Sequence, residues 1–137
     1  MTLKTEKVID VRFSEVDSMK VVWHGSYPLY FEDAREAFGR EHGLSYDVYI
    51  KNKVYAPLVD LDFHYKRPLR YGQQARIIIT YVPTDAAKII FKYEIRDNES
   101  GVVCCTGRSV QVFMDLEYQL LWAAPEFYEK WKKEHLK

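Results

Sequence analysis

The sequence predicts an α+β fold in which one long helix near the N-terminus packs against an antiparallel sheet built from later strands. Two observations lead to this class. One segment repeats its apolar residues with the spacing of a single helical face. The chain after it contains several runs in which apolar and polar residues alternate, which is typical of half-buried strands. Consecutive strands with short connections favour antiparallel pairing, and the helix must then bury its apolar stripe against the sheet.

The first predicted strand spans Lys7 to Phe13, and the loop from Ser14 to Ser26 that follows it has no clear periodicity. A long helix comes next. Ser26 is its expected N-cap, Pro28 lies in the first turn, where proline is tolerated, and Gly43 ends it. Its apolar face consists of Tyr27, Tyr30, Phe31, Ala34, Ala37 and Phe38. Its opposite side carries the charged residues Glu32, Asp33, Arg35, Glu36 and Arg40. Glu32 and Glu36 are expected to contact solvent or to pair with Arg35 or Arg40, three or four positions away.

The rest of the chain predicts mainly strands. Residues 45–51 form a short helical turn, and a charged helix begins at Pro125. The composition of residues 97–101 indicates a turn between two strands, and Gly107 is expected to form a β-bulge. The predicted strands are 59–65, 75–82, 88–96 and 102–114. The class is therefore α+β, with a curved antiparallel sheet expected around one long helix and a further helix at the C-terminus.

Length and composition argue against several classes of function. The 137 residues suit one domain, and 20 basic residues balance 20 acidic ones, so no overall charge attracts nucleic acid or an anionic membrane. No apolar run has the length of a signal peptide or a membrane span. The neighbouring Cys104 and Cys105 would point to opposite faces of a strand, which argues against a disulfide and favours the cytoplasm. The many aromatic residues are expected to line a pocket or a subunit interface.

The segment from Arg12 to Arg35 carries the chemistry. It places the carboxylate of Asp17, then His24, before the start of the long helix. The first turn of a helix has N–H groups without intrahelical partners and a partial positive charge. Such donors stabilise the oxyanion that forms from a thioester carbonyl, while a carboxylate attacks the carbonyl carbon or activates a water. Lys66, Arg67 and Arg70 lie in a later loop and are candidates for binding phosphate groups of a substrate, although charged loop residues more often simply contact solvent.

Several residues of this segment also follow the pattern of a known family: Arg12, Phe13, Glu15, Asp17, Val21, Val22, His24, Tyr27, Phe31, Glu32, Ala34 and Arg35. With them, the sequence resembles the hotdog-fold acyl-CoA thioesterases of the 4-hydroxybenzoyl-CoA thioesterase family. The segment 65–72 is similar to the family's connection between two strands, and the likeness runs from about Lys7 to Trp122. Two positions depart from the pattern: Lys20 stands where the family often has glycine, and Ser26 where it has asparagine.

The resemblance implies that residues 1–137 form a single hotdog domain that hydrolyses acyl-CoA to free acid and coenzyme A. Two protomers would share an active site, in a homodimer or homotetramer, without a cofactor or metal. Asp17 would be the nucleophile or general base, and backbone N–H groups near His24 would polarise the carbonyl. His24 itself would orient substrate or water. Its neighbours Trp23, Gly25 and Tyr27 would contact substrate.

Other functions remain in competition. Hydroxyacyl-thioester dehydratases use the same fold, but they rely on a histidine with a distant carboxylate on the helix, whereas Asp17 precedes His24 in one loop. A non-catalytic acyl-CoA sensor would keep the pocket and could dispense with Asp17. Some hotdog thioesterases use a helix carboxylate, which makes Glu32 and Glu36 the alternatives to Asp17. Asp60, Asp62 and His64 share a strand face, but alternate strand residues lie about 6–7 Å apart, too far to converge on one metal ion.

Overall fold

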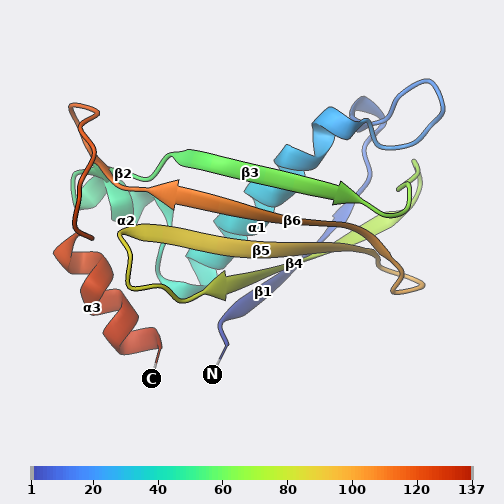
Figure 1. Cartoon of the computed structure of the whole chain (residues 1–137). Coiled ribbons are helices and arrows are strands. Elements are labelled where there is room, and N and C mark those ends of the chain that lie inside the picture. The colour runs from blue at the N-terminus through green and yellow to red at the C-terminus, as the bar shows by residue number, and fades with distance from the viewer. Residues whose placement is uncertain (1, 137) are drawn as a thin grey trace.

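A curved antiparallel sheet wraps around one long helix, α1 (Figure 1). The structure is a computed structural model and describes residues 2–136. Five strands form the sheet in the order β1-β4-β5-β6-β3, and each pairs antiparallel with its neighbours. The strands are β1 (Lys4–Asp10), β3 (Leu58–Tyr65), β4 (Gln74–Val82), β5 (Lys88–Asp97) and β6 (Val103–Val112). The predicted α+β hotdog architecture is confirmed.

Helix α1 (Tyr27–His42) buries its apolar face in the concave side of the sheet. The ring of Phe31, which is fully buried, stacks on Tyr93 of β5 at 4.1 Å and on Phe63 of β3 at 4.9 Å between ring centroids. The helix ends at Gly43, whose φ of 80° is a left-handed conformation that glycine adopts without strain. The aromatic spacing that predicted the helix therefore also explains its packing.

The start of α1 differs from the prediction in one respect. Ser26 takes the N-cap position, and Pro28 lies in the first turn as expected. The Ser26 hydroxyl, however, caps no helical N–H group. It donates instead to the backbone carbonyl of Glu15, at 3.0 Å. This bond connects the helix start to the preceding loop and leaves helical N–H groups available for other acceptors.

The predicted first strand was placed three residues too late. Strand β1 spans Lys4–Asp10, and Phe13 begins a 3₁₀ turn, Phe13–Glu15. β1 is an edge strand that pairs only with β4, and Thr5 is its one buried residue. With only one buried side chain, β1 shows little alternation of apolar and polar residues. The sequence pattern therefore placed the ends of this strand poorly.

The β-bulge predicted at Gly107 is wrong. Gly107 pairs regularly with Tyr93 and with Phe63, whereas the register shifts lie at Leu58/Asp60 and at Ile95/Arg96. A Cβ atom on Gly107 would lie 2.5 Å from a ring carbon of Phe31. Glycine is needed here because α1 approaches the sheet closely through that ring.

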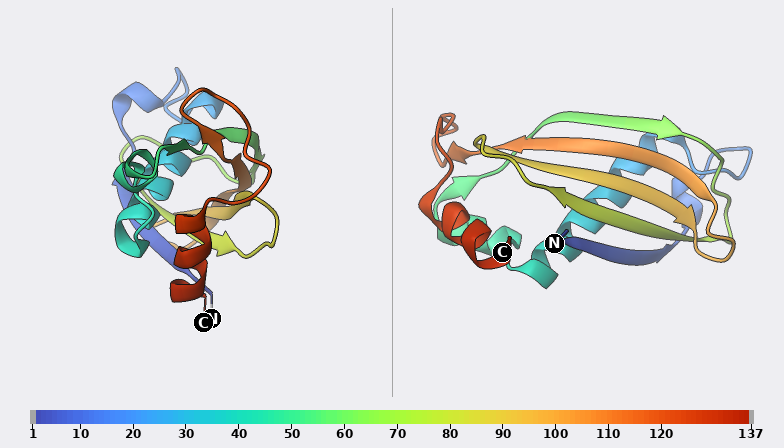
Figure 2. Two further views of the ribbon diagram at one scale, coloured as in Figure 1. Left: turned by 90° about the vertical axis from the view of Figure 1, so that its left-hand side faces the viewer. Right: turned by 60° about the horizontal axis from the view of Figure 1, so that its bottom comes forward.

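The smaller elements gather at one end of the sheet (Figure 2). Helix α2 (Tyr46–Lys51) confirms the predicted helical turn. The last predicted strand divides, because β7 (Met114–Asp115) leaves the main sheet and pairs with β2 (Val54–Tyr55). Helix α3 (Glu126–His135) follows Pro125, and its Trp131 donates from Nε1 to the carbonyl of His42 at 2.5 Å. Within residues 2–136, no helix is long and apolar enough to cross a membrane.

Candidate active site

The loop before α1 is held in place by Glu15, which is buried at 7% exposure. Its carboxylate oxygen Oε1 accepts hydrogen bonds from the N–H of Arg12 at 2.8 Å and from the hydroxyl of Tyr30 at 2.9 Å. Its backbone carbonyl accepts from the N–H of Trp23 at 2.9 Å and from the Ser26 hydroxyl at 3.0 Å. One buried residue thus connects both ends of the loop to the central helix.

Asp17 lies in a tight turn of this loop and is half-buried. Its N–H donates to the carbonyl of Val21, and its carbonyl accepts from the N–H of Lys20, both at 2.9 Å. Its carboxylate oxygen Oδ1 accepts from the N–H of Met19 at 2.8 Å. Within the described residues, no protein donor reaches the second carboxylate oxygen, Oδ2. The carboxylate is therefore oriented by one oxygen, and the other is free to contact a substrate or a water.

Lys20 shows why glycine is common at this position in the family that the sequence resembles. Its φ is 65°, in the left-handed region, where a residue with a Cβ atom costs about 1–2 kcal/mol. The neighbouring strand segment supports the turn, because Val21 forms an isolated bridge with Arg70 and the N–H of Tyr71 donates to the Lys20 carbonyl at 3.0 Å. The loop keeps its path without glycine because these contacts impose it.

A cavity of about 340 Å³ opens beside this turn, at the start of α1. Five of the residues predicted for the site line it: Asp17, His24, Tyr27, Lys66 and Arg67. Val22, Tyr65 and Pro68, which the prediction did not include, complete the lining. The hydroxyl of Tyr65 donates to the His24 carbonyl at 3.1 Å and so links the end of β3 to the helix start. Tyr65 could have been found, because it opens the segment 65–72 that resembles the family.

The other two predicted residues, Trp23 and Gly25, do not line the cavity. The Trp23 ring is half exposed and lies beside the His24 ring, with 4.8 Å between the ring centroids. It also covers Gly25 so closely that a Cβ atom there would overlap the indole. The Trp23 ring therefore packs over Gly25 and beside His24, outside the lining of the cavity.

Donors for an oxyanion are found where α1 begins. A 3₁₀ turn, His24–Ser26, leads directly into the helix. The N–H of Ser26 is used, because it donates to the Trp23 carbonyl at 2.8 Å. Among the hydrogen bonds of residues 2–136, the N–H groups of His24 and Gly25 have no acceptor. These two donors lie at the positive end of a 16-residue helix, where negative charge is stabilised.

The ionisable groups of the cavity differ in their surroundings. Burial raises the pKa of Tyr27 to about 12, so its hydroxyl is neutral at physiological pH and can donate a hydrogen bond. Lys66 and Arg67 also line the cavity, and both are exposed. The cavity therefore combines one oriented carboxylate and two exposed cations, and it lies beside a helix start with unused N–H donors.

The charged face of α1 agrees with the prediction only in part. Glu36 pairs with Arg40 at 3.1 Å, as expected for residues four positions apart. Arg35 does not face solvent fully. It is half-buried, and its Nη1 donates to the Tyr93 hydroxyl at 3.1 Å. Glu32 and Glu36, the alternative carboxylates, do not line the cavity that contains Asp17.

The fold and the site define a hotdog-fold thioesterase, and the chain belongs to the thioesterase-like superfamily, whose family model matches residues 11–132. The chain is 32% identical to the putative acyl-CoA thioesterase YneP of Bacillus subtilis over 136 residues, which covers 94% of this chain and 98% of that protein. The predicted thioesterase likeness and enzyme class are confirmed at the level of the family.

Solved structures agree with this assignment. The DHNA-CoA thioesterase of Staphylococcus aureus superposes with a TM-score of 0.85 at 25% identity, over 97% of this chain and 91% of that one. The 1,4-dihydroxy-2-naphthoyl-CoA thioesterase of Synechocystis gives a TM-score of 0.84 at 18% identity, with 98% of both chains covered. At that identity, the second likeness concerns the fold alone.

Proposed function

We propose that this chain is a single hotdog domain that hydrolyses acyl-CoA to a free acid and coenzyme A, with Asp17 as nucleophile or general base. The observation that carries the proposal is the half-buried Asp17 carboxylate in the same cavity as His24, at the helix end with unused N–H donors. Membership of the thioesterase-like superfamily and the likeness to a putative acyl-CoA thioesterase support it.

The reaction uses these groups as follows. The thioester carbonyl oxygen accepts hydrogen bonds from the N–H groups of His24 and Gly25, which stabilise the negative charge that develops on it. In one route, a carboxylate oxygen of Asp17 attacks the carbonyl carbon, the C–S bond breaks, and water hydrolyses the resulting anhydride. In the other route, Asp17 removes a proton from a water that attacks the carbon directly. Both routes release the thiol of coenzyme A.

The neighbouring residues bind and position the substrate. His24 orients the substrate or the attacking water, and Tyr27 shapes the wall beside the carbonyl. Lys66 and Arg67 bind phosphate groups of coenzyme A, because their exposed cations line the cavity. Trp23 positions this segment, because its ring packs beside the His24 ring and directly over Gly25.

The proposal includes an assembly in which two protomers share the active site, as a homodimer or a homotetramer. Strand β3 supports it, because it is an edge strand that pairs only with β6. Val59 on this edge is 57% exposed, which is costly for an apolar side chain in an unpaired strand. Antiparallel pairing of two β3 strands would cover this edge. We also expect a cytoplasmic location, because Cys104 and Cys105 are free thiols, which a reducing compartment favours.

Thiol release from a panel of short, medium, long and aromatic acyl-CoAs tests the function. The wild type is expected to hydrolyse at least one class, and Asp17→Asn is expected to lower kcat/KM at least about a hundredfold. Asp85→Asn is the matched control, because Asp85 is exposed in a remote loop and lines none of the cavities around α1. Binding of acyl-CoA without hydrolysis would instead indicate a sensor, and hydration of an enoyl-CoA would indicate a dehydratase.

Activity that survives in Asp17→Asn would move the search to Glu32 and Glu36. If Asp17 is required, repeated turnover in ¹⁸O-labelled water separates the two routes. Direct attack by the carboxylate incorporates ¹⁸O into Asp17 when water hydrolyses the anhydride at the Asp17 carbonyl, and mass spectrometry of the peptide detects it. Label in Asp17 would establish direct attack. A peptide without label after many turnovers would favour water activation, because hydrolysis of an anhydride at the acyl carbon also leaves Asp17 unlabelled.

A further inference from the structure

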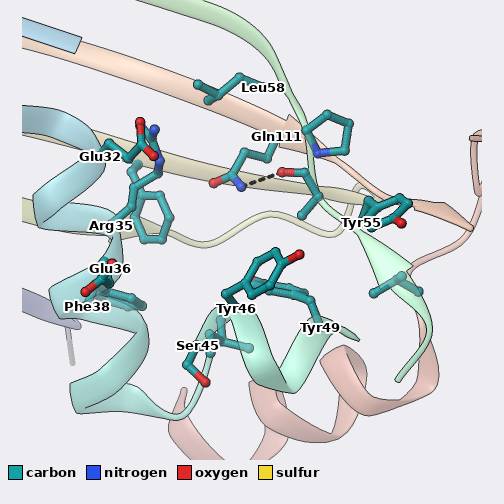
Figure 3. Close-up of a pocket in the computed structure, with 15 residues that line it drawn as sticks. Glu32, Arg35, Glu36, Phe38, Ser45, Tyr46, Tyr49, Tyr55, Leu58 and Gln111 are labelled. Atoms are coloured by element: carbon teal, nitrogen blue, oxygen red, sulfur yellow. Dashed lines mark hydrogen bonds between the residues drawn. The ribbon is translucent and has the colours of Figure 1, made fainter. Parts of the chain in front are cut away.

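A second and larger cavity, of about 580 Å³, lies farther along α1 (Figure 3). Helices α1 and α2 form one side, and residues 54–58 with β5 and β6 form the other. Most of its wall is apolar or aromatic, including Phe38, Leu44, Tyr46, Tyr49, Tyr55 and Phe91. Its volume is within the usual range for small-molecule sites. None of the residues that line the catalytic cavity contributes to it.

Arg35 brings a positive charge into this apolar wall (Figure 3). Its Nη1 donates to the Tyr93 hydroxyl at 3.1 Å, and that hydroxyl is hydrogen-bonded to the Ser109 hydroxyl at 2.6 Å. Tyr93 is 3% exposed and Ser109 is fully buried, so both are fixed by the core. The guanidinium is therefore held in one orientation by neutral partners, with most of its five N–H donors left for other acceptors.

The charge of Arg35 lacks a close counter-ion. No carboxylate of the described residues lies within 4.0 Å of its guanidinium. Glu36 is already paired with Arg40 at 3.1 Å. Glu32 lies near Arg35 on the same wall but forms no ion pair with it (Figure 3). A half-buried cation without a counter-ion is unfavourable, and an anion entering the cavity would compensate it.

We propose that this cavity binds a carboxylic acid with an apolar or aromatic body, with the carboxylate on Arg35 and the body among the aromatic rings. A guanidinium binds a carboxylate through two parallel hydrogen bonds, which is the geometry that its planar group favours. The ligand could come from two sources that share this chemistry. One is a free acid, and the other is the distal carboxylate of an acyl group that is still attached to coenzyme A.

Binding of the distal carboxylate of an acyl-CoA rests on the proposed function and on the proposed pairing of two β3 strands. The cavity includes Leu58, at the start of β3, whereas the catalytic cavity includes Tyr65, at its end. These positions are separated by about 23 Å of strand, so within one chain the two cavities are apart. An antiparallel β3 pair would bring the catalytic cavity of a second copy beside the Arg35 cavity. A long acyl group could then reach from one to the other.

Calorimetric binding of the purified protein to two matched pairs tests the site: octanoate against octanamide, and 3-phenylpropionate against its amide. The wild type is expected to bind each acid at least about tenfold more tightly than its amide, as for a hydrogen bond to a charged group. Arg35→Gln is expected to abolish this preference. Arg40→Gln, on the same helix but outside the cavity, is the matched control and should keep it.

Two further variants keep the test decisive if Arg35→Gln fails to fold, which a thermal melt would reveal. Arg35→Lys keeps the charge but loses the paired hydrogen bonds, so the preference is expected to shrink without vanishing. Glu32→Gln removes a neighbouring negative charge, so the acids should bind more tightly and the amides should not change.

Equal binding of acid and amide by the wild type, or no binding of either, would overturn the proposal. A preference that survives in Arg35→Gln, or that disappears in the Arg40→Gln control, would also overturn it. These results do not depend on hydrolysis, so a protein without thioesterase activity can still pass or fail this test.

Kinetics then distinguish the two sources. Adipoyl-CoA and hexanoyl-CoA have acyl chains of equal length, and only adipoyl-CoA carries a distal carboxylate. If the acyl group supplies the ligand, Arg35→Gln should lower kcat/KM for adipoyl-CoA at least about tenfold and leave hexanoyl-CoA unchanged. If both substrates are unaffected while acid binding is lost, the cavity is a site for free acids. Either result retains the carboxylate site.

Discussion

The hydroxyl of Tyr30 in the central helix donates a hydrogen bond of 2.9 Å to the buried carboxylate of Glu15 in the preceding loop. Burial, and then this hydrogen bond, raise the pKa of Tyr30 far above its usual value. Glu15 also receives the N–H of Arg12, two residues after the end of β1. The position of Asp17, two residues farther along, therefore depends on a buried polar contact that takes no part in the reaction.

Replacing Tyr30 by phenylalanine is expected to lower the free energy of unfolding by about 1–3 kcal/mol, because the buried carboxylate loses one of its donors. Urea denaturation measures this loss. Tyr46→Phe is the control, because Tyr46 is 72% exposed, and it should change stability by less than about 0.5 kcal/mol. Equal stability of the two variants would show that Glu15 does not need the Tyr30 hydroxyl.

Gly25→Ala is expected to lower kcat/KM for thioester hydrolysis by about tenfold or more, because its Cβ would displace the Trp23 ring from beside His24. The same change in a Trp23→Ala background meets no ring and should cost much less. A double-mutant cycle is therefore expected to give a coupling free energy of at least about 1 kcal/mol. Additive effects would mean that Trp23 does not transmit the change.

The C-terminal helix is expected to be part of the core. Trp131→Ala should lower the free energy of unfolding by about 3–5 kcal/mol, because the indole is 5% exposed, stacks on Tyr128 and caps α1 through the His42 carbonyl. Trp122→Ala removes the same side chain from a position that is 89% exposed, and it should have almost no effect on stability. Similar denaturation midpoints for the two variants would refute this role of α3.

Alkaline pH is expected to destabilise the protein through buried tyrosines. Burial raises the pKa of Tyr27 from 10.0 to about 12 in the folded state. Between these values the unfolded chain has released a proton that the folded chain still binds, so the free energy of unfolding falls as pH rises. Urea denaturation from pH 9 to pH 12 should show this decrease, and Tyr27→Phe should make it smaller. Tyr71→Phe, at an exposed position, should leave the decrease unchanged.

The sequence alone was sufficient for the central helix and for most of the residues that line the cavity beside Asp17. The spacing of aromatic residues defined α1, because that stripe packs on the concave face of the sheet. Asp17, His24 and Tyr27 were predicted to lie together because they belong to one short segment of the chain. The spacing of residues within such a segment can be recognised without knowledge of the tertiary structure. Lys66 and Arg67 come from a distant loop, and they were found only as basic residues near a recognisable connection.

Features that depend on tertiary contacts were missed. Gly107 was interpreted as a β-bulge, but glycine is required at this position because the Phe31 ring of α1 leaves no room for a Cβ atom. Arg35 was placed on the charged side of the helix, because helical spacing shows only which residues share a side. It does not show that the Tyr93 hydroxyl of β5 lies within hydrogen-bonding distance of Arg35. The left-handed φ of Lys20 likewise follows from contacts with residues 70 and 71.

Helix α1 contributes Tyr27 to one cavity and Arg35, about two turns farther on, to another. The loop that carries Asp17 is fixed by Glu15 and by backbone hydrogen bonds, and neither depends on the walls of the Arg35 cavity. If the Arg35 cavity binds its proposed ligand, substitutions at Tyr46 or Tyr55 are expected to change ligand preference without moving Asp17. Ligand preference and the geometry of the Asp17 loop would then be separately adjustable, so a protein engineer could redesign one without disturbing the other.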